Sequence, residues 1–189
     1  MTESSVFDPA DRAVPYVDEG EGPVALVLIP EAGTDHDVLG VVSHYLAEEA
    51  GFRVLRIGHR PGGADLALAD RADDVIAVMD HVGLSDAWIG GHGFGGTVAG
   101  AVVAQHHERA NGLLLLGVED AEIELAPVLP VLIVQATADE VTPAANAERL
   151  QAKAPERSSI KIVDGADHLF PVTHPVETAV IIEEYLDWD

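Results

Sequence analysis

Short apolar runs alternate along this chain with segments whose apolar residues recur at helical spacing. The pattern is typical of a parallel β-sheet covered by helices, because each strand reaches its parallel neighbour through a helical crossover. Strands are expected at residues 24–29, 52–57, 87–90, 113–117, 131–136 and 160–163, and helices at 37–49, 65–82, from the glycines after 90 to near 109, 144–153 and 175–188. The chain of 189 residues therefore predicts a single α/β domain spanning 1–189, with a mostly parallel central sheet flanked by helices.

The composition restricts the partners that this domain can bind. There are 33 acidic and 10 basic residues, a formal net charge of −23, and no cysteine. Such a surface repels phosphate backbones and anionic lipids, so neither nucleic acid nor membrane is expected as a partner. Disulfides and thiolate chemistry are excluded. We expect a small-molecule substrate or ligand, neutral or cationic, with no cofactor and no metal; the oligomeric state stays open.

The N-terminal stretch gives an expectation about location. Residues Met1–Arg12 are polar and acidic, without the basic and apolar regions of a secretory signal. The apolar runs are also far too short to cross a bilayer. A cytoplasmic protein is therefore expected.

A glycine-rich turn lies between the strand expected at 87–90 and the helix that follows. It reads Gly91-His92-Gly93-Phe94-Gly95-Gly96. A strained strand-to-helix turn of this kind is the context of the G-x-S-x-G motif, in which the third residue carries a nucleophilic hydroxyl. Here the third residue is Gly93, which has no side-chain oxygen. Taken alone, the turn could also serve only close packing between strand and helix.

Two polar residues follow later strands in the order that this motif requires. Asp139 comes after the strand at 131–136, and His168 after the strand at 160–163. Their order after the turn, acid and then histidine, differs from the chymotrypsin and subtilisin orders. Read separately, Asp139 could cap the next helix, Glu140 could replace it as the acid, and His168 could be a surface histidine.

Together these motifs resemble the α/β-hydrolase superfamily over nearly the whole chain. The turn is similar to the Gly-His-Ser-x-Gly-Gly elbow of esterases at every position except the nucleophile. The resemblance implies that Asp139 and His168 are the other two members of a catalytic triad. Only the acidic segment 118–130 stands where many members insert a lid, so a lidless protein with an open, shallow site is expected.

The segment Pro30-Glu31-Ala32-Gly33 departs from the family pattern of His-Gly followed by small residues. The resemblance implies that the oxyanion hole is formed by the backbone N–H groups of Ala32 and Phe94. A carboxylate at Glu31 would oppose negative charge developing there. Glu31 is therefore either a functional carboxylate of the site or a solvated loop residue.

Without a nucleophile, weak or no ester hydrolysis is expected. Three hypotheses stay open. In the first, Gly93 is an engineered replacement that silences a serine esterase; in the second, His168, oriented by Asp139, is a general base in non-covalent chemistry. In the third, the protein is an inactive pseudoenzyme that binds a small molecule or a protein. The N-myc downstream-regulated proteins also look like α/β hydrolases without the serine.

Overall fold

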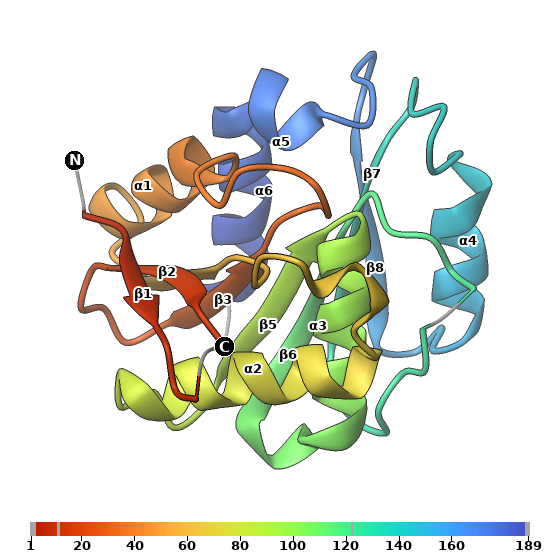
Figure 1. Ribbon diagram of the computed structural model, residues 1–189. Helices are drawn as coiled ribbons and strands as arrows, with labels where there is room; N and C mark the ends of the chain where they lie inside the picture. Colours follow the sequence, from red (N-terminus) through yellow and green to blue (C-terminus); the bar gives the residue numbers. More distant parts are fainter. Residues whose placement is uncertain (1–2, 11, 122, 188–189) are drawn as a thin grey trace.

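The computed structural model describes residues 3–10, 12–121 and 123–187. They form one eight-stranded sheet in the order β1-β2-β4-β3-β5-β6-β7-β8, flanked by helices on both faces (Figure 1). The strands are β1 (Ser5–Phe7), β2 (Val14–Glu19), β3 (Ala25–Ile29), β4 (Arg53–Ile57), β5 (Ala87–His92), β6 (Ala110–Leu116), β7 (Val131–Ala136) and β8 (Ser158–Val163). The helices are α1 (Gly40–Glu48), α2 (Leu68–His81), α3 (Phe94–Gln105), α4 (Ala145–Ala152), α5 (Phe170–Thr173) and α6 (Pro175–Leu186).

The six strands from β3 to β8 are parallel, which confirms the predicted α/β sheet. Their side chains alternate between two cores. Along β3, Val27 and Ile29 belong to the core beneath α2, α3 and α4, whereas Leu26 and Leu28 belong to the core beneath α1, α5 and α6. Because both faces are buried, the strand reads as a continuous apolar run rather than as an alternating one.

Several elements differ from the sequence prediction. Two strands were missed: β2, which pairs antiparallel with β4, and β1, which pairs antiparallel with β2. Strand β2 is only partly buried and contains Pro15, so its apolar signal is weak. Strand β5 continues through the glycines to His92, because these residues pair with β6. Helix α1 begins three residues later than expected, and α5 was not predicted. Trp188, the predicted end of the last helix, lies outside the described residues.

The segment between β6 and β7 contains no helix or strand within its described residues, 117–121 and 123–130. The domain therefore carries no separate lid there, as predicted. In the part of the chain that the structure describes, no helix is both long enough and apolar enough to cross a membrane.

All the candidate site residues follow the carboxyl ends of parallel strands. Glu31 follows β3, Gly93 follows β5, Asp139 follows β7 and His168 follows β8. Parallel strands place their carboxyl ends at one edge of the sheet, where α/β proteins bind ligands. The topology alone thus brings these four positions to one edge.

Candidate active site

Gly93 occupies the sharp turn between β5 and α3. Its backbone has φ 55° and ψ −124°. This conformation is energetically unfavourable for any residue that carries a side chain, and glycine adopts it more easily. Its N–H donates to the carbonyl of Leu116 at 3.0 Å, and its own carbonyl accepts from Gly96 at 3.0 Å. The turn therefore has the strained strand-to-helix geometry expected of a nucleophile elbow, with no nucleophile at its tip.

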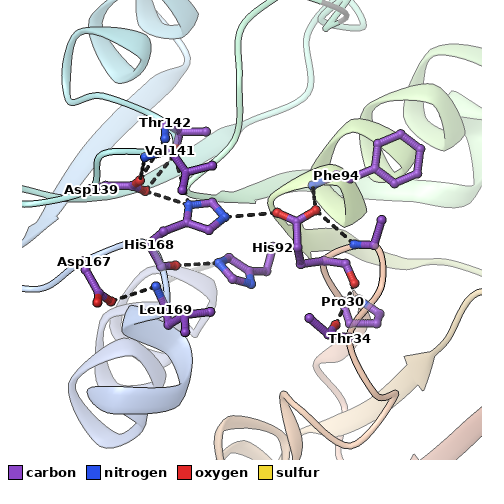
Figure 2. A network of polar contacts seen from close by, with 12 residues as sticks. Pro30, Thr34, His92, Phe94, Asp139, Val141, Thr142, Asp167, His168 and Leu169 are labelled. Atoms are coloured by element: carbon purple, nitrogen blue, oxygen red, sulfur yellow. Dashed lines mark hydrogen bonds and ion pairs between the residues drawn. The ribbon is translucent and has the colours of Figure 1, made fainter.

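Asp139 and His168 are in direct contact, as Figure 2 shows. Oδ2 of Asp139 lies 2.9 Å from Nδ1 of His168 and also accepts from the Thr142 hydroxyl at 2.6 Å. Oδ1 accepts from the backbone N–H groups of Val141 and Thr142 at 2.9 and 2.8 Å. Burial raises the pKa of Asp139, but these hydrogen bonds outweigh burial and hold the pKa below its usual range. The neighbouring Glu140 is exposed.

The Glu31 side chain turns into the site and fills it. One oxygen, Oε1, accepts from the N–H groups of Ala32 and Phe94, both at 2.9 Å. These are the two donors expected to form the oxyanion hole. The other oxygen, Oε2, lies 3.0 Å from Nε2 of His168. A Cβ built on Gly93 would lie 1.6 Å from Oε2. The carboxylate therefore occupies the space of the missing serine side chain and the hole beside it.

His168 consequently lies between two carboxylates. The hydrogen bond with Glu31 raises the pKa of His168, and Asp139 adds to this against the opposing effect of burial. For Glu31, burial raises the pKa, but the hydrogen bonds from His168, Phe94 and Ala32 outweigh burial and leave the pKa below its usual value. Each partner thus favours the charged form of the other. Both ring nitrogens of His168 thus lie within hydrogen-bond distance of a carboxylate oxygen, an arrangement that favours the protonated imidazole.

This arrangement predicts that the pKa values of two neighbouring histidines, His168 and His92, are shifted in opposite directions. The pKa of His168 lies above its ordinary value of 6.5, whereas burial lowers the pKa of His92. The centres of the two imidazole rings are 4.7 Å apart. We expect an NMR titration of the imidazole carbons to show this split, and Glu31→Gln to lower the pKa of His168 because its strongest partner loses its charge. A His168 pKa that does not change in Glu31→Gln would contradict the ion pair.

The same shifts predict how stability depends on pH. A raised histidine pKa stabilises the fold fully below 6.5 and ceases to do so as the pH rises through the folded value. A lowered glutamate pKa stabilises it above 4.5 and ceases to do so as the pH falls through the folded value. The unfolding free energies of the native chain and of Glu31→Gln should therefore differ most between pH 4.5 and pH 6.5. Urea unfolding at about pH 5.5 and pH 9 tests this, and an equal or larger difference at pH 9 would contradict it.

Two residues missed by the sequence reasoning hold the Glu31 segment. His59 donates Nε2–H to the carbonyl of Pro30 at 2.8 Å. Its Nδ1 lies 3.4 Å from a guanidinium nitrogen of Arg71, whose Cζ stands 5.2 Å from the centre of the Phe94 ring. His59 and Arg71 thus connect the two segments whose N–H groups bind Glu31 Oε1: His59 contacts Pro30, and Arg71 contacts Phe94. The position of His59 just after the strand predicted at 52–57 was the signal that could have identified it.

A pocket of about 440 Å³ lies beside His168. Val141 and Leu169 give it exposed apolar walls, and Glu140 and Asp167 add carboxylates. The pocket therefore has both apolar walls and acidic side chains beside His168.

Comparison with known proteins agrees with this architecture. A structure described as a predicted CIB-like hydrolase from Thermoplasma acidophilum superimposes with a TM-score of 0.82 at 15% identity, covering 98% of each chain. A thermophilic esterase from Thermogutta terrifontis gives 0.78 at 17% identity, covering 99% of this chain and 98% of that one. MGS-MChE2, an alpha/beta hydrolase enzyme from a lagoon-sediment metagenome from Mar Chica, Morocco, gives 0.83 at 17%, covering 97% and 98%. At these identities the likeness shows the fold alone.

The sequence itself carries the family assignment. Residues 25–170, more than half of the chain, match the Alpha/beta hydrolase family. The matched span begins at the start of β3 and ends just beyond His168, so it includes all the candidate site positions described above. The chain belongs to the α/β-hydrolase family.

Proposed function

We propose that this protein is a hydrolase-family member in which the Glu31 carboxylate has replaced the serine hydroxyl, so that it acts on a small molecule through Glu31, His168 and Asp139 and does not hydrolyse esters by acyl transfer. The observation that supports this is the position of Glu31, whose two oxygens contact the oxyanion-hole donors and His168. The strongly acidic composition keeps nucleic acid and membranes disfavoured as partners, and the cytoplasm remains the expected location.

Acyl transfer requires a nucleophile, a base that activates it and a free oxyanion hole. Gly93 supplies no nucleophile. Each ring nitrogen of His168 is already in contact with a carboxylate oxygen, which favours its protonated form over the free base. The N–H groups of Ala32 and Phe94 already bind Oε1. Each of the three requirements fails separately, and Glu31 causes two of the failures.

The geometry also bears on the origin of Gly93. A serine placed at this position, with nothing else changed, would put its Cβ 1.6 Å from Glu31 Oε2. Glycine at 93 and glutamate at 31 therefore fit one another as a pair. This favours a natural glycine over a silenced serine esterase.

A second candidate is a pseudoenzyme that binds a ligand without transforming it. The observation that favours it is the saturation of the site: Glu31 and His168 each bond to protein partners through both polar atoms of the side chain. Such a network stabilises the closed arrangement in the absence of any substrate.

The proposal is tested with a fluorophosphonate probe and p-nitrophenyl acetate on the native chain and on Gly93→Ser. We expect neither protein to be labelled and neither to exceed the rate of a folded His168→Ala control. Circular dichroism establishes that each variant is folded. Ester turnover by the native chain that disappears in His168→Ala would overturn the proposal.

A further inference from the structure

We propose that a small cavity beside the Glu31 segment binds a single halide ion, held by the guanidinium group of Arg71. The cavity has a volume of about 10 Å³ and lies between the end of β3, the residues after β4, and helices α2 and α3. Its polar walls are His59, Arg60, Arg71 and Asp74. The inference goes beyond the proposed function, because it assigns a second site that takes no part in the chemistry at the elbow.

The guanidinium group of Arg71 is buried and only partly hydrogen-bonded. The residue is 9% exposed. One terminal nitrogen lies 3.4 Å from Nδ1 of His59, and the other donates to the carbonyl of Gly63. Nε is enclosed and has no hydrogen-bond partner among the residues that the structure describes. Because an enclosed donor without an acceptor destabilises the fold, this N–H requires an acceptor in the adjoining cavity.

The charge of Arg71 also lacks a counter-charge. No carboxylate oxygen in the described part of the chain lies within 4.0 Å of its nitrogens. Both oxygens of Asp74 bind Arg60 at 2.7 Å, and Oδ1 also lies 3.5 Å from Arg12. The ring of Phe94, centred 5.2 Å from Cζ of Arg71, offers only its π face. Three guanidinium groups thus share one carboxylate, and a small anion would offset the excess positive charge.

This excess is a local exception in a strongly acidic chain. Only 10 residues are basic against 33 that are acidic, and three of the ten gather around Asp74 and the cavity. His59 adds no charge, since burial lowers its pKa and the charge of Arg71 lowers it further. Salt screens the exposed acidic surface, whereas charges inside the fold interact strongly. The overall charge of the protein therefore does not prevent an anion from binding here.

The size and lining of the cavity favour an anion of one atom. A volume of about 10 Å³ is close to the space that one water-sized occupant needs. Sulfate, phosphate and carboxylates are too large for it. A water molecule would accept the hydrogen bond from Nε but would bring no counter-charge, whereas chloride does both. The apolar walls offer a water molecule no further hydrogen bonds; they are Ile29, Ile57, Val75 and Val98.

The position of the cavity connects it with the candidate active site. Arg71 packs against Phe94, and His59 donates to the carbonyl of Pro30 at 2.8 Å. A halide that fixes Arg71 would therefore stabilise both segments that supply the two N–H donors of the oxyanion hole. The Arg60 side chain is 20% exposed, so the cluster lies close to solvent, from which an ion can enter.

Anomalous diffraction tests the position of the ion. Crystals of the native chain grown in sodium chloride are measured at a long wavelength, at which chloride scatters anomalously and water does not. We expect an anomalous peak within hydrogen-bond distance of Arg71 Nε. A cavity without a peak, or one that holds a water molecule, would overturn the proposal.

A titration tests binding in solution, with sodium chloride replacing sodium gluconate at constant ionic strength. We expect the imidazole NMR signals of His59 to shift saturably, and those of the exposed His44 to stay unchanged. Arg71→Met should weaken chloride binding at least about tenfold, because it removes a charge-assisted hydrogen bond. Arg149→Met is the matched control, since it removes the same charge at an exposed position on α4 and should leave binding unchanged.

Urea unfolding gives a second readout. The midpoint should be higher in chloride than in gluconate for the native chain and Arg149→Met, and this difference should vanish in Arg71→Met. Equal midpoints for the native chain, or a saturable His59 shift that persists in Arg71→Met, would overturn the proposal. If Arg71→Met does not fold, the diffraction and the titration of the native chain decide. None of these measurements depends on ester turnover, so the proposed function is tested separately.

Discussion

A variant carrying both Glu31→Ala and Gly93→Ser is expected to become a serine esterase. We expect it to react with fluorophosphonates and to hydrolyse p-nitrophenyl acetate on the order of 100-fold faster than the native chain, since restoring a triad member recovers part of the rate that its loss removes. The variant gains a hydroxyl at the tip of the elbow. Removal of the carboxylate frees the N–H groups of Ala32 and Phe94 to bind an oxyanion.

The two changes should act together rather than add. With Gly93→Ser alone, the new side chain overlaps Glu31 Oε2. With Glu31→Ala alone, there is no nucleophile. Only the double variant has both a serine next to His168 and no Glu31 carboxylate to raise the pKa of His168. In that variant His168 can act as the base.

Kinetics on the four proteins of this cycle measure the coupling between the two sites. Adding His168→Ala to the double variant should abolish the gain, which controls for non-specific hydrolysis. If the double variant folds and remains inert, then Asp139, His168 and the two donors are not arranged for acyl transfer. The resemblance to an esterase site would then be one of fold only.

Gly95→Ala is expected to destabilise the fold by about 3 kcal/mol or more, because overpacking against fixed backbone has no cheap relief. A Cβ on Gly95 would lie 2.2 Å from the carbonyl oxygen of Ile29 and 2.4 Å from that of Pro30. Both atoms belong to the backbone at the end of β3. To admit the methyl group, α3 and this segment must separate, which also draws Phe94 away from Glu31.

Gly83→Ala is the matched control. Gly83 has φ 71°, and nothing lies within 4 Å of a Cβ built there. Its substitution costs only the left-handed strain of about 1–2 kcal/mol. Urea unfolding of both variants distinguishes the free-energy cost of left-handed backbone strain, present at Gly83, from that of the steric overlap with the β3 backbone at Gly95. If Gly95→Ala costs no more than Gly83→Ala, the close approach of β3 to α3 is not needed for stability.

The sequence by itself determined the class of fold and the places of the site residues. The continuous apolar runs predicted buried parallel strands, and β3 through β8 match them closely. Once the strands are parallel, residues that follow them share one edge of the sheet. This is why the contact between Asp139 and His168, 29 residues apart, was predictable from motif order. Strands β1 and β2 were missed, because β1 is a short, mostly exposed edge strand and β2 is only partly buried, so both carry a weak apolar pattern.

Only the tertiary structure decided what Glu31 does. From the sequence, it could equally have been a solvated loop residue. Its direction depends on contacts across the fold: Gly95 lets the end of β3 approach α3, His59 holds the carbonyl of Pro30, and His168, 137 residues away, binds Oε2. A local pattern sets which residues form a strand or a turn. The direction of a loop side chain follows from packing between distant segments, and that packing places a carboxylate where a serine was expected.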